Sequence, residues 1–191
     1  HNLRLVRRLA GNARVYAVCK GDAYGFSAAA IARLAQDEGV AALACGDADD
    51  ARAIRADGVA LPILLYAATN ADDLRALAAL DVIVTAHDEA TLAACLAHGL
   101  RFSLKLDAGF NRFGFREQDL SVVLAAAARH PAARPHGLYT HLTDNDDAAS
   151  VAAQVARFTA MADRIAAAGW RGAERMVASS RILIAAPELA L

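Results

Sequence analysis

The sequence predicts an α/β fold of the (β/α)8 TIM-barrel type, incomplete because about one of the eight strand–helix units is missing. Short apolar runs alternate strictly with Ala/Leu/Arg-rich amphipathic stretches, which is typical of a parallel sheet. An open doubly wound sheet would need a long crossover where the strand order reverses, and none is visible. An intact barrel needs about 250 residues, whereas this chain has 191.

The strands are predicted where apolar and β-branched residues form short runs bounded by turn residues. In chain order the expected strands are 14–20, 40–45, 62–66, 81–85, 102–107, 136–141 and 175–179. We expect the polar residues that follow these strands to gather at one edge, because the carboxyl ends of parallel strands carry the functional residues in barrels and open sheets alike.

The helices are predicted from apolar residues at i, i+3 and i+4 spacing. Leu74, Leu77 and Ala78 show this spacing, as do Val155, Phe158 and Ala162 later in the chain. The expected helices are 2–9, 28–38, 47–56, 71–79, 88–98, 117–129 and 151–168. The whole chain is predicted to form one domain, 1–191, excerpted from a longer protein, because it starts at His1 and stops within an apolar run.

Composition narrows the classes of function. Hydrophobic residues make up 57% of the chain, which excludes a disordered protein, and 20 basic against 21 acidic residues argue against a nucleic-acid-binding module. No apolar run approaches the roughly 18 residues of a membrane span. The three scattered cysteines indicate free thiols in a reducing, cytoplasmic compartment, and the histidines show no metal-ligand spacing, so no metal is expected.

Lysine is scarce in this chain. Lys20 and Lys105 are the only lysines among the 20 basic residues; the rest are arginine. Arginine serves a solvated surface as well as lysine does, but it cannot replace an amine that must lose its proton. The two lysines are therefore the first candidates for chemistry.

Lys20 follows an apolar run and precedes a glycine-flanked turn. We expect apolar neighbours to lower the pKa of its amine, which favours a Schiff base with pyridoxal phosphate. Tyr24, Ser179 and Ser180 are candidates to bind the phosphate through their hydroxyls or neighbouring backbone amides. The alternative for each residue is a strand-end side chain that faces solvent or caps a helix.

Four motifs then suggest a family. KGDAYGF, LKLDAGFNRFGF, THLTDNDD with Gln154 and Phe158 downstream, and VASSRILIAAPE resemble, in order and approximate spacing, the KANAYGHG, KLDTGMNRLGF, THLATADE and ANSAALLRLPE segments of alanine racemases. Together they cover nearly the whole chain, which resembles the N-terminal barrel domain of that family.

The resemblance implies roles for the matching residues. Lys20 matches the lysine that bonds to the cofactor and acts as one of two catalytic bases. Tyr24 matches a phosphate-binding tyrosine, and Ser180 a phosphate-binding serine. The remaining matches are Arg112, near the cofactor's phenolic oxygen and the substrate carboxylate; His141, in the hydrogen-bond network around the ring; and Lys105, carbamylated in some members.

The sequence also departs from the family. Ser179 stands where many members have Asn, and Phe26 and Ser27 replace His and Gly after the tyrosine. The arginine that holds the pyridine nitrogen and the tyrosine that serves as the opposite base have no match here. We therefore expect the isolated chain to be inactive.

The activity implied is racemisation of L-alanine to D-alanine, supplying peptidoglycan, by a protein that is a homodimer at full length. Two alternatives stay open. One is a broad-specificity or serine racemase of the same fold, and the other is a non-catalytic remnant that binds pyridoxal phosphate.

Overall fold

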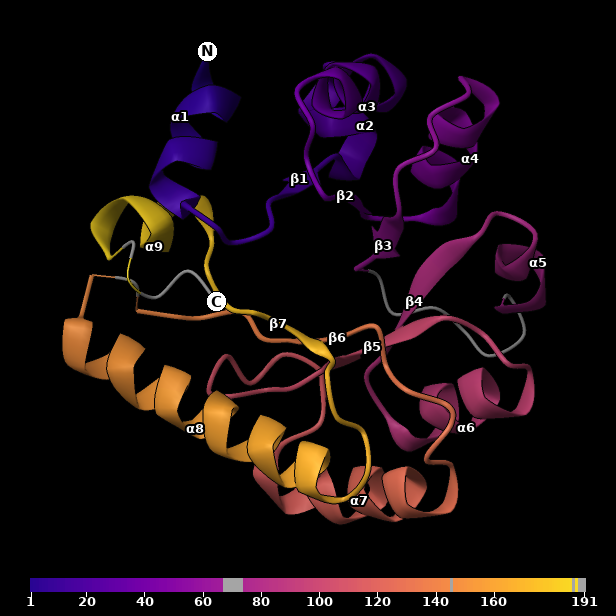
Figure 1. Ribbon diagram of the computed structural model, residues 1–191, viewed down its shortest axis with the longest axis vertical. Coiled ribbons are helices and arrows are strands. Elements are labelled where there is room, and N and C mark those ends of the chain that lie inside the picture. The colour runs from indigo at the N-terminus through magenta and orange to yellow at the C-terminus, as the bar shows by residue number, and fades with distance from the viewer. Residues whose placement is uncertain (67–73, 145, 187, 189–191) are drawn as a thin grey trace. The chain divides into compact units, whose positions relative to one another are not determined.

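The computed structural model describes residues 1–66, 74–144, 146–186 and 188, which form two compact units, 1–85 and 86–191 (Figure 1). In both units parallel strands alternate with helices. No helix within the described ranges is long and apolar enough to cross a membrane.

The first unit carries a parallel sheet in which neighbours in the chain are neighbours in the sheet. Its elements are α1 (Asn2–Ala10), β1 (Tyr16–Val18), α2 (Lys20–Gly25), α3 (Ala28–Asp37), β2 (Ala42–Cys45), α4 (Ala48–Ala56), β3 (Ile63–Leu65), α5 (Leu74–Ala78) and β4 (Val82–Ala86), which ends at the boundary. Val18 pairs with Ala44, Cys45 with Leu65, and Leu64 with Ile83.

The second unit repeats this pattern with β5, β6 and β7 in order. Its elements are α6 (Glu89–Ala97), β5 (Phe102–Lys105), the 3-10 turn η2 (Glu117–Asp119), α7 (Leu120–Arg129), β6 (Gly137–Tyr139), α8 (Ala148–Ala167), β7 (Glu174–Met176) and α9 (Ser180–Ala185). Lys105 pairs with Tyr139, and Tyr139 with Met176. Helix α8 lies alongside α7 (Figure 1).

The central strands form the core of each unit. Strands β2 to β6 are buried along their whole length, as expected for parallel strands covered on both faces. Trp170 fills the space beside β5, where its ring contacts Phe102 edge-on at 5.6 Å and its indole N–H donates to the His130 carbonyl at 2.9 Å. Strands β1 and β7 are more exposed.

Every predicted strand is present, and most end earlier than predicted. β1 stops at Val18 and β7 at Met176, although the Cys19 amide still donates to the Ala44 carbonyl of β2. Helix α8 begins at Ala148, three residues before its predicted start, because the Asp147 carboxylate caps it by accepting from the Ala149 and Ser150 amides. Within α5, Leu74 and Leu77 are buried, but Ala78 is exposed.

Other elements differ in kind. The predicted helix 117–129 is split into η2 and α7, and neither α2 nor α9 was expected. The predicted helix 71–79 is found as α5, while its first residues, 71–73, lie outside the described part of the chain.

Candidate active site

Lys20 lies two residues after the last residue of β1, at the carboxyl end of the first strand. The strand runs into Cys19, whose amide donates to the Ala44 carbonyl at 2.8 Å and whose side chain is fully buried. Lys20 is exposed instead.

The turn that carries Lys20 is left-handed. Gly21, Asp22, Ala23 and Tyr24 all have positive φ, between 52° and 60°. A left-handed conformation costs about 1–2 kcal/mol for each residue with a Cβ atom. Three such residues in succession store strain beside Lys20, and tertiary contacts must compensate for it.

The amine of Lys20 lies over the Tyr24 ring, 5.8 Å from its centroid. Among the described residues, nothing forms a hydrogen bond or an ion pair with this amine. The expectation that apolar neighbours surround Lys20 is wrong, because the left-handed turn leaves the side chain in solvent. Tyr24 is also open, with 65% of its surface exposed, so its hydroxyl is accessible.

Gly46 follows β2 and lies beside the Cα and Cβ atoms of Lys20. A Cβ atom on Gly46 would lie only 3.0 Å from Lys20 Cβ, closer than most Cβ atoms approach a neighbour. The absence of a side chain at Gly46 therefore lets the β2–α4 connection approach the start of the turn.

Lys105 ends β5 in the second unit, and the segment after it folds back onto the strand. The Phe115 amide donates to the Lys105 carbonyl at 2.9 Å, and the Asp107 amide donates to the Phe115 carbonyl at 2.8 Å. Gly114 permits this return, since a Cβ there would lie 2.8 Å from both Lys105 Cγ and the Lys105 carbonyl oxygen.

The buried carboxylate of Asp107 organises this returning loop. It accepts from the amides of Gly109 and Asn111, both at 3.0 Å, and of Arg112 at 3.1 Å. Burial opposes the ionisation of Asp107, but these amides and the nearby Lys105 charge outweigh it and hold the pKa of its carboxyl below the usual value. The loop that presents Arg112 is therefore built around one ionised side chain.

Lys105 is the buried lysine of the chain, with 3% of its surface exposed. Its amine donates to the Leu106 carbonyl at 3.2 Å and lies 5.6 Å from the Tyr139 ring centroid. Burial lowers the pKa of this amine to about 8; Asp107 partly opposes that change and Arg112 adds to it.

The loop brings Lys105 and Arg112 to the same aromatic ring. The Lys105 amine lies 5.7 Å from the Phe113 centroid and the Arg112 guanidinium 5.6 Å from it. The guanidinium also stacks on Phe110 at 4.4 Å, and Phe110 in turn contacts the His141 ring at 5.1 Å. Arg112 and His141, both exposed, are thus linked through one phenylalanine.

Gln154 holds the segment that follows His141. Its buried side-chain amide accepts from the Thr143 amide and donates to the Thr143 carbonyl, both at 3.0 Å. A Cβ on Gly109 would lie 3.2 Å from Gln154 Cγ, so the Asp107 loop also packs against this side chain.

Ser179 and Ser180 lie at the start of α9, after β7. The Ser179 hydroxyl accepts from the Ile182 amide and so caps the helix, whereas the exposed Ser180 hydroxyl has no partner among the described residues. Arg181 pairs with Asp146 on the segment between β6 and α8.

The structure groups these residues by unit: Lys20 with Tyr24 in the first, and Lys105, Arg112 and His141 in the second. Sequence reasoning missed the supporting carboxylate of Asp107. Asp107 belongs to a recognised motif, but its own role could not be read from spacing. Of the described residues, no group of three or more His, Cys, Asp or Glu side chains is placed to hold a metal ion.

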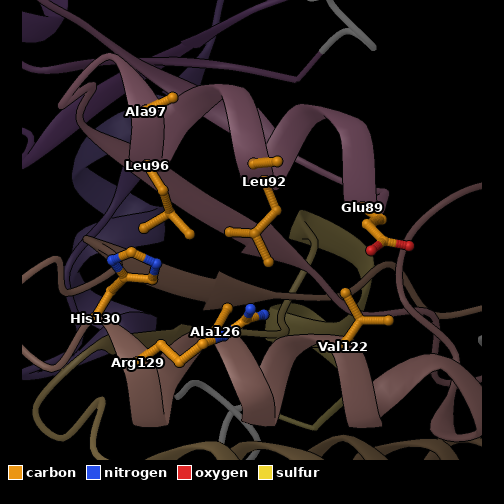
Figure 2. A pocket seen from close by; sticks show the side chains of 9 residues that line it. Glu89, Leu92, Leu96, Ala97, Val122, Ala126, Arg129 and His130 are labelled. Carbon is orange, nitrogen blue, oxygen red and sulfur yellow. The ribbon is translucent and has the colours of Figure 1, made fainter.

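A groove of about 290 Å³ lies between α6 and α7 (Figure 2). Leu92 and Leu96 of α6 lie on one side of it and Ala126 of α7 on the other, with Glu89 toward one end and His130 toward the other. None of the predicted site residues lines it.

The fold and these side chains define a class of protein: a parallel α/β barrel type with an exposed lysine after the first strand. The model of the family "Alanine racemase, N-terminal domain" matches residues 1–191. The chain therefore belongs to the alanine racemase family.

The sequence relatives agree. An alanine racemase of Mycobacterium ulcerans is 32% identical over 100% of this chain and 52% of its own length, and one of Sorangium cellulosum is 30% identical over 98% and 53%. The chain thus spans about half the length of the curated relatives it matches.

Solved structures agree as well. The alanine racemase of D-cycloserine-producing Streptomyces lavendulae has a TM-score of 0.90 at 28% identity, covering 100% of this chain and 53% of that chain. That of Corynebacterium glutamicum has a TM-score of 0.90 at 24% identity, with 99% and 56% covered. The predicted fold class, an incomplete (β/α)8 barrel, is confirmed.

Proposed function

We propose that the longer protein containing this chain is a pyridoxal-phosphate-dependent racemase that interconverts L- and D-alanine. Membership of the alanine racemase family supports the reaction. The observation that carries the proposal within the structure is the exposed amine of Lys20 on its left-handed turn, without a hydrogen-bond or ion-pair partner among the described residues. An amine that must react with a carbonyl has to be accessible in this way.

The side chains of the first unit fit the cofactor. Lys20 offers an accessible nucleophilic amine, and Tyr24 offers an exposed phenol 65% open to solvent for a phosphate oxygen. When bound, pyridoxal phosphate supplies an electron sink that stabilises charge at the carbon losing its proton. Lys20 Nζ would hold the cofactor and move the proton at the substrate α-carbon as a general base.

The side chains of the second unit suit the binding of anionic groups and of the cofactor ring. Arg112 presents a guanidinium that the Asp107 loop positions, and it would bind the substrate carboxylate in a bidentate way. His141 would orient the ring, with Phe110 beside it. The Ser180 hydroxyl would bind phosphate, whereas Ser179 uses its side chain to cap α9, so only its backbone suits that role.

Reductive trapping tests this proposal. The protein is incubated with pyridoxal phosphate, reduced with borohydride and mapped by peptide mass spectrometry. We expect the pyridoxyl group on Lys20 and no labelling in Lys20→Arg. A label on Lys105 in the wild-type protein would contradict the assignment. Racemisation of L-alanine and L-serine by the longer protein, followed by chiral chromatography, then distinguishes an alanine racemase from a serine or broad-specificity enzyme.

A second part of the proposal is that Lys105 is carbamylated. Its lowered pKa of about 8 leaves roughly a fifth of the amine neutral near physiological pH, far more than for an ordinary lysine, and a neutral amine adds carbon dioxide to form a carbamate and release a proton. The resulting anion would accept hydrogen bonds from Arg112, which shares the Phe113 ring with Lys105. Labelling with carbon-13 bicarbonate is expected to give a carbamate NMR signal that is lost in Lys105→Ala; its absence from the wild type would contradict this part.

The wider setting is also proposed. The three cysteines are free and buried, which supports a reducing, cytoplasmic compartment. The resemblance to alanine racemases supports a homodimer at full length and a role in supplying D-alanine for peptidoglycan. Size-exclusion chromatography with light scattering on the longer protein tests the dimer.

A further inference from the structure

The left-handed turn after Lys20 needs an external support. Within the turn, the Ala23 amide donates to the Cys19 carbonyl at 3.0 Å and the Phe26 amide to the Ala23 carbonyl at 3.2 Å. These two hydrogen bonds are local, and they do not offset the backbone strain of three non-glycine residues at positive φ. Such backbone persists only where the surrounding structure holds it.

Asp50 on α4 supplies that support. Its Oδ1 accepts from the Asp22 amide at 2.9 Å, across 28 residues of sequence. The Asp22 carboxylate then accepts from the Ala28 amide at 2.7 Å, where α3 begins. The two carboxylates thus join α4, the turn and α3 in one chain of hydrogen bonds.

Asp50 is itself held in place and is costly to bury. It is only 7% exposed, and its amide donates to the Asp47 carboxylate at 2.9 Å. Its Oδ2 is buried without a hydrogen-bond partner among the described residues. A buried carboxylate with one oxygen unsatisfied destabilises a fold, so its presence calls for a compensating role.

The location of Asp50 indicates that role. Gly46 lies four residues before it, where a Cβ atom would crowd Lys20 Cβ at 3.0 Å. The β2–α4 connection therefore lies against the Lys20 side chain, and the helix that follows it carries the Asp50 carboxylate that binds the Asp22 amide.

We infer that Asp50 is a positioning residue, which holds the Lys20–Tyr24 turn in its left-handed conformation through the Asp22 amide. The consequence for the cofactor rests on the proposed function: the amine of Lys20 and the hydroxyl of Tyr24 keep their spacing only while this bond is formed. Asp50 touches neither substrate nor cofactor.

The test compares Asp50→Ala with Asp50→Asn. Asparagine keeps an acceptor of the same size for the Asp22 amide, whereas alanine removes it. Asp49→Ala is the matched control, because Asp49 lies in the same helical turn but is exposed and pairs only with Arg52 among the described residues. Should Asp50→Ala fail to fold, Asp50→Ser, whose hydroxyl is too short to reach, provides the same comparison.

The first measurement is amide hydrogen exchange without cofactor. We expect exchange at residues 21–24 to accelerate at least tenfold in Asp50→Ala and less than threefold in Asp50→Asn and Asp49→Ala, with β2 unchanged. Equal acceleration in β2 would indicate a general loss of stability and would overturn the inference. So would wild-type exchange in the turn of Asp50→Ala.

The second measurement is the Kd for pyridoxal phosphate, from its absorbance change. We expect Asp50→Ala to bind at least tenfold more weakly and Asp50→Asn to recover wild-type affinity to within threefold. Unchanged affinity in Asp50→Ala would overturn the consequence for the cofactor. If the wild type fails to bind pyridoxal phosphate at all, the proposed function fails, while the exchange measurement still decides the role of Asp50.

Discussion

Ser27 has a φ of 69°, at a position where the alanine racemase motif has glycine. The side chain partly compensates by accepting from the Ala30 amide at 3.4 Å as the N-cap of α3. A residue with a Cβ atom is strained in this conformation, while replacing a Ser cap with Gly costs only a few tenths of a kcal/mol.

Ser27→Gly is therefore expected to raise the free energy of unfolding by about 1 kcal/mol. Ser27→Ala, which keeps the Cβ atom but loses the cap, is expected to lower it by about 1 kcal/mol. Urea denaturation followed by circular dichroism measures both changes. A glycine variant less stable than the wild type would show that the cap outweighs the backbone strain.

Lys105 makes stability depend on pH in a defined direction. Its pKa is about 8 in the folded chain against 10.5 for the ordinary amine. The unfolded chain therefore binds this proton more tightly, so stability falls as the pH drops from 10.5 toward 8 and then levels off.

The expected loss over this interval is about 3 kcal/mol, because one pKa unit corresponds to about 1.4 kcal/mol. Lys105→Met removes the titrating group and fills a similar volume. We compare the free energy of unfolding of the variant with that of the wild type. This difference should favour the variant by about 3 kcal/mol more at pH 7 than at pH 11. Denaturant titrations in carbon-dioxide-free buffer at several pH values test this, and parallel pH profiles would contradict it.

Among the elements, the loop between β5 and η2 depends most on one side chain. Asp107 accepts three backbone amides within this loop, and hydrogen bonds to a charged group contribute about 1.5–3 kcal/mol each. Asn111, with a φ of 57°, is held in a left-handed conformation by one of them.

Asp107→Ala is expected to lower the free energy of unfolding by roughly 2–4 kcal/mol at pH 7. Because the folded pKa of Asp107 lies below the usual carboxyl value, its contribution is complete above about pH 4 and is lost as the pH falls through the folded pKa. The difference in stability between the wild type and the variant should therefore narrow as the pH falls below about 4. Asp107→Asn, which retains acceptor capacity, should lie between them; constant separation at every pH would contradict the assignment.

Across the whole molecule, arginine has replaced lysine almost everywhere, so the chain has very few reactive amines. Besides the N-terminal amine, only Lys20 and Lys105 occur, and one is exposed while the other is 3% exposed. Amine-directed reagents therefore report directly on the burial of each lysine.

Trace acetylation of the native chain is expected to modify Lys20 at least tenfold faster than Lys105, since a buried amine reacts only after local opening. In guanidinium chloride the two rates should become equal, which serves as the control. Mass spectrometry of the peptides measures both. Equal labelling in the native chain would show that Lys105 is accessible.

The sequence alone determined the order of strands and helices, the two lysines and the motifs that follow the strands. Those features are local, since apolar periodicity and residue type act within a few positions.

Only the tertiary structure decided how those motifs are held. The left-handed turn after β1 depends on the carboxylate of Asp50, 28 residues away from the Asp22 amide that it accepts, so no local pattern predicts it. Lys20 is exposed, although apolar neighbours were expected around it, and Lys105 is buried. The burial of a side chain at a strand end depends on which segments fold back over it. The Asp107 loop returns over Lys105 and removes that amine from water, whereas the strained turn carries Lys20 away from the sheet.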